Sequence, residues 1–228
     1  MISIIVTAHN HEKYIIKCLN SILRNDKDLL NEIIVINDSS NDQTEKKIKN
    51  LLKTYKKIKY LCVNYSKPSK SKNLGVKISN SKWIIFVDGD DFIKKNFLHK
   101  YLKSIKEDVD FTYSNIFKYY TKNHFIFENQ KRNKFIKYLN NPVGGGCLIK
   151  KKIWHKLKGI DENLVYQDDY DFWLKIHLEK KMTIKYLDYT GYFYRKHTNN
   201  RSTNFFRKYT TKIILLFKFF IKKLCQNF

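Results

Sequence analysis

The hydrophobic positions in the first third of the chain fall into short apolar runs separated by longer stretches with a helical repeat. The runs are rich in β-branched residues and predict strands at residues 2–7, 32–37, 58–64 and 83–87. Between them, apolar positions three and four apart predict helices at residues 11–23, 42–55 and 69–78. Because strand and helix alternate, we expect an α/β fold with a mostly parallel central sheet flanked by helices.

A different pattern begins near residue 91. Residues 110–129 carry alternating aromatic side chains, which predicts an antiparallel ribbon, and residues 151–157 and 168–178 have the repeat of helices. Further strands are expected at residues 183–187 and 192–194. A loop at residues 141–146 ends in three glycines, which either bring the backbone close to a ligand or form a flexible connection. We expect one domain over residues 1–203, with halves at 1–91 and 92–203, and a tail at 204–228.

The chain is strongly basic. Its 228 residues include 45 Lys plus Arg against 21 Asp plus Glu, a formal net charge of +24 with neutral His. Three explanations are open: a nucleic-acid partner, an anionic membrane surface, or a compositional bias without a partner. Only five basic residues are Arg, unlike nucleic-acid surfaces that use bidentate Arg. With 43% hydrophobic residues, 7 Gly and 2 Pro, the chain is expected to be globular.

The cysteines and the longest apolar runs indicate in which cellular compartment the protein is expected. The 4 Cys lie far apart without a CxxC pair, which argues against a disulfide framework and a structural zinc site. The first residues already belong to a predicted strand, so we expect no secretory leader. Uninterrupted apolar runs are much shorter than the roughly 18 residues of a membrane-spanning helix. We therefore expect a cytoplasmic protein.

Acidic residues are scarce, so the places where they gather are informative. Three groups follow predicted strands or open a predicted helix: Asp38 after the second strand; Asp88, Asp90 and Asp91 after the fourth; and Asp168, Asp169 and Asp171 at the start of the helix at 168–178. Ligands of open α/β sheets bind beyond the carboxyl ends of strands, so Asp38 is placed to accept hydrogen bonds from a ligand. A turn that leads into the next helix is the alternative for Asp38.

The other two groups suggest a cation and a base. Three carboxylates within four residues repel one another unless a cation neutralises them, and oxygen ligands suit Mg²⁺ or Mn²⁺. A solvated acidic turn is the alternative. In the group at 168–171, one carboxylate is explained by its favourable interaction with the helix dipole. Another carboxylate could act as general base toward a hydroxyl, if this group lies at a cleft.

Together with their neighbours, these residues resemble the motifs of the family 2 glycosyltransferases of the GT-A fold, over about residues 1–203. The motifs follow the family's order: Thr7-Ala8-His9-Asn10, Asn37 to Asp42, Ser71 to Gly75, Asp88-Gly89-Asp90, Gly159 to Asn163, Asp168 to Leu174, and Tyr194 to His197 with Ser202. The resemblance implies an inverting transfer of a sugar from a nucleotide-diphosphate donor, with UDP the expected nucleotide. Residues 1–91 would bind the nucleotide and residues 92–203 the acceptor.

The resemblance also implies roles for single residues. The donor nucleotide would contact Thr7, Ala8, Asn10, Asp38, Lys72, Asn73 and Asp88. A divalent cation, Mn²⁺ or Mg²⁺, would bind Asp90, Asp88 and His197. Asp169 would be the catalytic base, with Asp168, Arg195 and Trp173 on the diphosphate and acceptor side. Asn37 and Lys72 stand where the family usually has Asp and Arg, and Asp168 where Glu is common, so a nucleotide-sugar binder without catalysis is an alternative.

The function expected from this resemblance has a rival in another class. The chain would transfer a sugar to a hydroxyl of a glycan or lipid-linked acceptor, in cell-surface polysaccharide biosynthesis at the inner face of the membrane. The rival is a basic nucleic-acid-binding protein whose aromatic side chains stack on bases. Acidic groups at strand ends disfavour the rival, so no nucleic-acid partner is expected.

The tail differs in kind from the rest of the chain. After Asp188 there is no acidic residue, whereas the remaining 40 positions hold nine Lys plus Arg. At about 100° per residue, one helix face collects Phe206, Tyr209, Ile213, Leu216, Phe217, Phe220 and Leu224. The opposite face holds Arg207, Lys208, Lys212, Lys218 and Lys222, with Leu215 and Phe219 as apolar exceptions. Residues 205–228 are predicted to lie on an anionic membrane surface, and a helix docked on the domain is the alternative.

Overall fold

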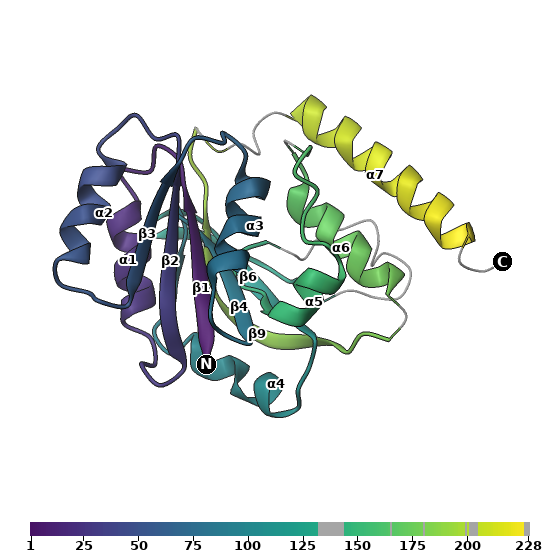
Figure 1. Ribbon diagram of the computed structural model, residues 1–228, viewed down its shortest axis with the longest axis horizontal. Helices are drawn as coiled ribbons and strands as arrows, with labels where there is room; N and C mark the ends of the chain where they lie inside the picture. The colour runs from purple at the N-terminus through teal and green to yellow at the C-terminus, as the bar shows by residue number, and fades with distance from the viewer. Residues whose placement is uncertain (132–143, 165, 180, 199, 201–204, 226–228) are drawn as a thin grey trace.

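The computed structural model describes residues 1–131, 144–164, 166–179, 181–198, 200 and 205–225. Within these residues the chain forms one nine-stranded mixed sheet with helices on both faces (Figure 1). Neighbouring strands follow the order β3-β2-β1-β4-β8-β6-β9-β5, and β7 pairs with β6 outside this row. The predicted α/β architecture, a central sheet flanked by helices, is confirmed. Within the described ranges the sheet is not mostly parallel as predicted, because four of its eight strand pairings are antiparallel and all four involve strands after β4.

The first half is the predicted alternation of strands and helices. Its strands run parallel and are β1 (Ile2–Ala8), β2 (Leu30–Asp38), β3 (Ile58–Val63) and β4 (Trp83–Asp88). The helices between them are α1 (Ile15–Leu23), α2 (Thr44–Leu52) and α3 (Pro68–Ile78). All seven elements predicted for this half are confirmed, with ends that differ by up to a few residues because turns and caps carry no periodicity.

Two apolar cores lie on the two faces of this sheet. Along β1, Ile4 and Val6 belong to the core that includes α1 and α2, whereas Ile5 between them packs in the core that includes α3. Successive side chains of a strand point to opposite faces, so a strand buried on both faces must be apolar throughout. This explains why the strands of the first half read as continuous apolar runs in the sequence.

The second half adds antiparallel pairings to the sheet. The predicted ribbon at 110–129 is confirmed as the antiparallel pair β6 (Phe111–Thr121) and β7 (His124–Glu128). β6 also runs parallel to β9 (Ile184–Arg195). β8 (Leu148–Lys150) lies antiparallel between β4 and β6 and joins the two halves. The predicted helices are α5 (Lys151–Lys156) and α6 (Asp168–Leu178), which lie on the same side of the sheet as α3 (Figure 1).

Several short elements were not predicted. They are β5 (Phe92–Ile93), β8, the 3-10 helix η1 (Leu98–Tyr101) and the helix α4 (Leu102–Lys106). Segments of two to five residues contain too little periodicity to be recognised, and β5 and β8 exist through pairing with distant strands. The two strands predicted at 183–187 and 192–194 are one strand, β9, with an irregular register against β6 between them.

Helix α7 (Phe205–Cys225) confirms that the tail is helical (Figure 1). It packs beside α6 and buries Leu215 and Phe219, the two apolar exceptions on its basic side. Six of the seven residues of the apolar face predicted for membrane contact are exposed, among them Phe206 at 77% and Phe217 at 68%, whereas Leu216 packs partly against the core. Docking on the domain and an exposed apolar face thus occur together, on opposite sides of one helix. None of the described helices combines the length and apolar character needed to cross a membrane.

Some sequence predictions fall on other parts of the chain. Four predicted features lie outside what the structure describes. They are the side chains of Arg207 and Lys208, the residue Ser202, residues 141–143 of the predicted loop, and the predicted boundary between residues 203 and 204.

Candidate active site

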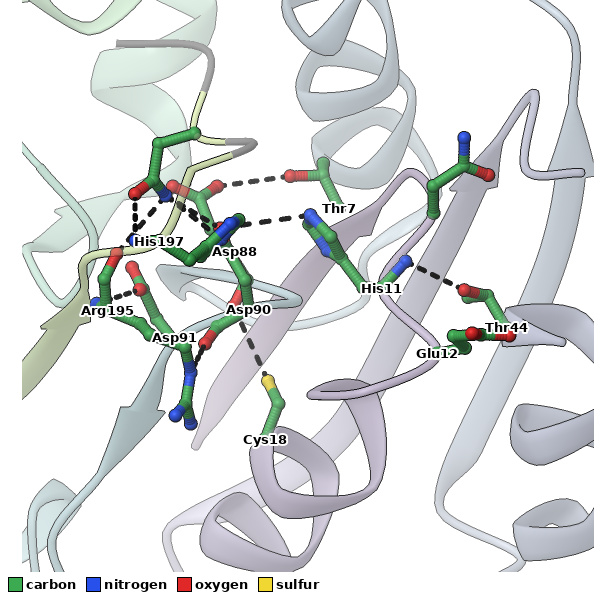
Figure 2. A network of polar contacts seen from close by, with 12 residues as sticks. Thr7, His11, Glu12, Cys18, Thr44, Asp88, Asp90, Asp91, Arg195 and His197 are labelled. Atoms are coloured by element: carbon green, nitrogen blue, oxygen red, sulfur yellow. Dashed lines mark hydrogen bonds and ion pairs between the residues drawn. The ribbon is translucent and has the colours of Figure 1, made fainter. Parts of the chain in front are cut away.

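Most of the predicted site residues come together at or beside the carboxyl ends of β1, β2 and β4. Thr7 of β1 lies directly beside Asp88 of β4 in the sheet register. The end of β9 reaches the same edge, where Arg195 and His197 lie beside the acidic turn that follows β4 (Figure 2). Because parallel strands end at one edge, side chains far apart in sequence meet there, and this is where open α/β sheets bind ligands.

The acidic turn at residues 88–91 is tied to β1. Thr7 Oγ1 donates a hydrogen bond to Asp88 Oδ1 at 3.2 Å, and the Gly89 amide donates to the Thr7 carbonyl at 2.9 Å. A Cβ on Gly89 would lie 2.7 Å from His11 Nδ1, so the turn requires glycine for this close approach. The position of Asp88 and of the residues after it is therefore set by backbone contacts with β1.

Asp91 links the turn to β9 and is not available as a ligand (Figure 2). It is 1% exposed, and its carboxylate accepts hydrogen bonds from Tyr192 Oη at 2.5 Å and from the Arg195 amide at 2.7 Å. Burial, followed by the charges of Asp90 and Asp88, raises the pKa of Asp91 well above its usual value. Asp91 thus has a structural role, which leaves Asp88 and Asp90 as the acidic residues that can face a ligand.

Asp90 lies between two imidazole rings. Its Oδ2 is 2.9 Å from His197 Nε2, 3.8 Å from His11 Nε2 and 3.3 Å from Asn200 Nδ2. Burial opposes its ionisation, but the hydrogen bond with His197 and the charges of His11 and His197 outweigh burial and lower the pKa of Asp90. Arg195 Nε donates to the Asp90 carbonyl at 2.7 Å. The structure therefore brings Asp90 into contact with Arg195 and His197, which lie 105 and 107 positions later in the sequence.

The three acidic residues at the start of α6 have three different environments. Asp168 is 3% exposed and pairs with Lys72 at 3.0 Å. Asp171 pairs with Lys175, one turn later on the helix, at 2.7 Å. Within the described residues Asp169 has no ion pair, and its Oδ1 accepts a hydrogen bond only from the neighbouring backbone amide, at 2.9 Å. Asp169 is therefore the acidic residue of this group that is available to exchange a proton with a ligand.

Asp169 lines a small pocket of about 40 Å³ beside the acidic turn. The pocket is lined by Lys72, Phe86, Asp88, Gly144, Gly145, Cys147, Ile149, Trp154, Ile160, Asp169 and Phe172. Burial and the charge of Asp168 raise the pKa of Asp169 to about 6, with Lys72 acting in the opposite direction. A carboxyl group that titrates near neutrality in a pocket is suited to accept a proton from a substrate hydroxyl.

The glycine run closes this pocket against Tyr192. A Cβ on Gly145 would lie 1.9 Å from Tyr192 Oη, so a larger residue could not occupy this position without moving the tyrosine. Tyr101 Oη donates a hydrogen bond to the Gly146 carbonyl. Tyr192 also anchors Asp91, so the glycine loop and the acidic turn rest on the same ring. An approach of this loop to a donor sugar stays a prediction.

Asp38 organises the loop that follows β3. Its two oxygens accept hydrogen bonds from the amides of Tyr65, Ser66 and Lys67, at 2.8, 2.7 and 3.0 Å, and from Ser71 Oγ at 2.9 Å. Burial opposes ionisation, but these hydrogen bonds outweigh it and lower the pKa of Asp38. A nucleobase would have to share oxygens that protein donors already engage. The predicted contact of Asp38 with the donor nucleotide therefore stays a prediction.

Ala8, Asn10 and Asn73 also have contacts within the protein. Ala8 is buried at the end of β1. Asn10 Oδ1 accepts a hydrogen bond from the Asn41 amide at 2.8 Å, which connects the loops after β1 and β2. Asn73 makes two hydrogen bonds with the backbone of the turn before α6. Its Nδ2 donates to the Ile160 carbonyl at 2.9 Å, and its Oδ1 accepts from the Ile160 amide at 3.2 Å. Asn10 and Asn73 thus shape the loops around the site.

Trp173, predicted on the acceptor side, is buried in the core and is not brought to the site. Its ring is 1% exposed and packs against Tyr113 and Phe111 of β6, at ring-centre distances of 5.7 and 6.1 Å. The reason is that α6 packs most of its apolar residues in the core and lines the pocket only with Asp169 and Phe172, near its start. Trp173 belongs to the core that holds this turn in place.

No three His, Cys, Asp or Glu side chains in the described ranges are arranged to hold a metal ion by themselves. The predicted ligands Asp90 and His197 are in contact at 2.9 Å, and Asp88 lies in the same turn.

Comparison with known proteins decides the family. The model of the family described as Glycosyl transferase family 2 matches residues 3–157, from β1 through α5. The chain belongs to glycosyl transferase family 2.

Curated relatives of this family 2 chain include proteins from archaea and bacteria. An uncharacterized glycosyltransferase of Methanocaldococcus jannaschii is 29% identical over 189 residues, covering 77% of this chain and 64% of the relative. The poly(ribitol-phosphate) beta-N-acetylglucosaminyltransferase TarS of Staphylococcus aureus is 37% identical over 100 residues, or 42% of this chain and 17% of TarS. The chain thus spans less than two thirds of either relative. The Escherichia coli glucosyltransferase WfaP is 26% identical over 219 residues, covering 91% of this chain and 82% of WfaP.

Solved structures confirm the fold of this family 2 member. S. aureus TarS 1-349 in complex with UDP-GlcNAc matches with a TM-score of 0.77 and 22% identity, over 97% of this chain and 66% of that one. A longer TarS structure matches with a TM-score of 0.69 over 86% of this chain and 36% of that one. The GT-A fold expected from the sequence motifs is therefore confirmed, together with the C-terminal helix.

Three residues of the family 2 site were not predicted from the sequence. His11 faces Asp90, and burial lowers its pKa against the opposing charges of Asp90 and Asp88. Tyr192 holds Asp91, and Asn200 donates to Asp90. His11 directly follows the first motif, which is a signal that could have found it. Tyr192 and Asn200 carry no such signal, because their roles arise from contacts with residues more than a hundred positions away.

Proposed function

We propose that this family 2 member transfers a sugar from a UDP-sugar to a hydroxyl of a glycan or lipid-linked acceptor, with inversion, in cell-surface polysaccharide biosynthesis. The observation that carries the proposal is Asp169, a carboxyl with a pKa of about 6 in a pocket that Lys72 and Asp88 also line. One TarS structure contains UDP-GlcNAc. WfaP is described as acting on UDP-Glc and alpha-D-GlcNAc-diphosphoundecaprenol. These relatives support the donor and acceptor classes.

The donor is proposed to bind over the edge formed by the ends of β1, β2 and β4. Its nucleotide would contact the residues predicted for it: Thr7, Ala8, Asn10, Asp38, Lys72, Asn73 and Asp88. Lys72 and Arg195 supply positive charge near the acidic turn, where the diphosphate would lie, and His197 lies beside Asp90 in the same place. Asp168 holds Lys72 at 3.0 Å and so positions this ammonium beside the pocket.

The acidic turn fits a divalent cation that binds together with the donor. Asp90 is largely ionised because its pKa is lowered, and its oxygen lies beside the His197 imidazole. Mg²⁺ in enzymes is typically held by one or two carboxylates together with substrate phosphates, so fewer than three protein ligands suffice. Asp90, Asp88 and His197 would hold Mn²⁺ or Mg²⁺, which neutralises charge on the leaving diphosphate when bound.

The proposed reaction is a single displacement. The acceptor oxygen forms a bond to the anomeric carbon while the bond from that carbon to the diphosphate oxygen breaks, and UDP leaves with the electron pair. Asp169 takes the proton of the acceptor hydroxyl, and attack opposite the leaving group inverts the configuration. Asp168 assists because its negative charge, with burial, makes Asp169 more basic. Holding the two reactants in this geometry contributes much of the rate.

The proposed activity is tested by screening UDP-, GDP- and dTDP-sugars with the full chain and Mn²⁺. We expect calorimetric binding and slow hydrolysis with UDP-sugars, both reduced by a chelator. Failure of every nucleotide sugar to bind would contradict the proposal. Binding without hydrolysis or transfer to any acceptor would instead favour the nucleotide-sugar binder without catalysis.

We further propose that α7 attaches the protein to the inner face of the cell membrane. Eight of its apolar side chains are exposed: Phe206, Tyr209, Ile213, Ile214, Phe217, Phe220, Ile221 and Leu224. Such a contiguous exposed apolar surface is typical of an interaction site. Lys218 and Lys222 are exposed on the same helix, and no acidic residue follows Asp188. A lysine-flanked apolar face suits the interface of an anionic bilayer.

Vesicle flotation tests this attachment. The full chain is expected to float with vesicles containing phosphatidylglycerol and to float less with pure phosphatidylcholine. Replacing Ile213 and Phe217 by Ser should lower the partition coefficient at least about tenfold, because burial of one such side chain is worth about 1.5–3 kcal/mol. Tyr55→Ser, at an exposed aromatic residue far from α7 in sequence, is the control and should leave flotation unchanged. Equal flotation of all forms, or a dimer that forms through α7 without lipid, would contradict the attachment.

A further inference from the structure

An open groove of about 440 Å³ lies on the sheet at β5, β6, β7 and β9, separate from the pocket of Asp169. It is lined by Lys17, Phe92, Lys94, Phe117, Tyr119, Lys122, Phe125 and Phe193. The proposed mechanism uses none of these residues. The volume is in the range of about 300–1,000 Å³ that is typical of small-molecule sites.

The floor of the groove is a layer of aromatic rings. Phe92 stacks on Phe193 with ring centres 4.5 Å apart and planes 5° from parallel, and Phe117 stacks on the same ring at 5.1 Å. Phe125 packs edge-on against Phe117 at 5.1 Å and is 49% exposed. Phe127, two residues further along β7 and so on the same face as Phe125, is 52% exposed. Exposed apolar side chains gathered on one hairpin indicate a surface that binds a partner or ligand.

Lysines border this aromatic floor. Lys17 Nζ lies 4.0 Å from the centre of the Phe92 ring, and Lys94 Nζ lies 5.0 Å from that of Phe117. No carboxylate lines the groove, and within the described residues none of Lys17, Lys94 and Lys122 forms an ion pair. Ammonium groups held over ring faces are placed to meet an anion at the edge of an apolar surface. The groove therefore complements a molecule with an apolar body and an anionic group.

Arg195 connects the groove with the active site. Its guanidinium carbon lies 5.2 Å from the centre of the Phe92 ring and 5.1 Å from that of Tyr119. On its other side, Arg195 Nε donates to the Asp90 carbonyl at 2.7 Å. One side chain thus separates the aromatic floor from the acidic turn. A ligand in the groove would have its polar end close to the site where the donor diphosphate is proposed to bind.

We propose that this groove binds an amphiphilic phosphate, an apolar chain that ends in a phosphate or diphosphate, as the lipid end of the acceptor. The inference rests on the proposed function, in which the acceptor is lipid-linked. The apolar floor takes the chain, and Lys17, Lys94 and Lys122 take the phosphate. A single-stranded nucleic acid would require a longer basic track along its backbone, whereas this groove is one pocket.

Farnesyl phosphate is a soluble probe for this groove. The full chain is expected to bind it in equilibrium dialysis, and to bind farnesol and inorganic phosphate much more weakly. The double variant Phe125→Ala, Lys94→Ala should weaken farnesyl phosphate binding at least about tenfold, since it removes both a ring of the apolar floor and an ammonium group at its border. Tyr120→Ala, Lys118→Ala is the matched control on the same hairpin, because neither residue lines the groove, and it should keep wild-type affinity.

The outcomes separate this inference from the proposed function. If the wild-type chain binds UDP-sugars but not farnesyl phosphate, the groove proposal fails and the transferase proposal stands. If farnesyl phosphate binds but no nucleotide sugar does, the proposed function fails while the assignment of the ligand class to the groove stands. Equal binding by the groove and control variants, or displacement of farnesyl phosphate by an oligothymidylate, would overturn the groove proposal. A circular dichroism melt of each variant verifies that it is folded.

Discussion

Replacing Asp169 by Asn is expected to abolish sugar transfer while UDP binding stays nearly unchanged. Asn has the same shape and can still accept the hydrogen bond that the Tyr170 amide donates at 2.9 Å, but it cannot take a proton from the acceptor. Loss of a general base lowers the rate by about 10²–10⁴-fold. Transfer is measured as UDP release with acceptor present, and UDP binding by calorimetry. Wild-type turnover in this variant would show that Asp169 is not the base.

The pH dependence of the wild-type enzyme provides a second readout of Asp169. Burial and the charge of Asp168 raise its pKa to about 6, so the carboxyl is protonated, and unable to act as base, at lower pH. Transfer at saturating substrates is therefore expected to rise through about pH 6. In Asp169→Asn this rise should be absent from any residual activity. Asp171→Asn, at an acid of the same helical turn that pairs with Lys175, is the control and should keep both the rate and the profile.

The same shift in pKa predicts that Asp169→Asn is more stable than the wild type at neutral pH. The folded-state pKa of about 6 lies above the unfolded value of 3.8, so the stabilising contribution of protonated Asp169 is complete below pH 3.8 and is lost as pH rises through 6. Above pH 6 the buried carboxylate destabilises the fold by up to about 3 kcal/mol, and Asn removes this cost. A higher melting temperature at pH 7.5, with transfer lost, would exclude unfolding as the cause of inactivity.

Asp90→Ala is expected to abolish cation-dependent UDP binding. The substitution removes the carboxylate that lies 2.9 Å from His197 and leaves the backbone carbonyl that accepts a hydrogen bond from Arg195. The turn should therefore persist while its charge is lost. Changes even in groups around a metal ligand lower affinity by about 10–100-fold, so loss of the ligand itself should cost at least as much. Calorimetric titration of UDP with Mn²⁺, and again with a chelator, measures the effect.

Asp90→Asn separates charge from shape in this experiment. Asn can keep hydrogen bonds with His197 and Asn200 but carries no charge, so its UDP affinity with Mn²⁺ should fall toward that of Asp90→Ala. In the chelator, wild type and both variants should bind UDP with similar, weak affinity. Unchanged affinity in Asp90→Ala with Mn²⁺ would show that the acidic turn does not hold the cation.

The contacts of Tyr192 illustrate how the site depends on the fold. Tyr192 donates to Asp91 at 2.5 Å and packs against the glycine loop that lines the Asp169 pocket. The acidic turn and the glycine loop that lines the pocket of Asp169 therefore share one support, the ring of Tyr192. This arrangement explains why three acidic residues within four positions have different tasks, since Asp91 binds β9 while Asp88 and Asp90 remain at the site.

The sequence alone was sufficient for the elements of the first half and for the main acidic residues of the site. Apolar runs and helical repeats are local, so β1 to β4 and α1 to α3 could be recognised from their own residues. Asp88, Asp90 and Asp169 stood out because carboxylates are rare in a chain with a net charge of +24. Their order along the chain led to the family that the later comparison established.

Only the tertiary structure decided which acidic residues are paired with other protein groups and which remain available at the site. Lys72 and Asp168 meet across 96 positions, and Asp91 and Tyr192 across 101, and no local pattern encodes such pairs. The same holds for α7, whose helical repeat shows two faces but not which face has a partner. Its docking through Leu215 and Phe219 became visible only beside α6, and it leaves the larger apolar face exposed. Periodicity reports the shape of one segment, whereas burial depends on what the rest of the chain places against it.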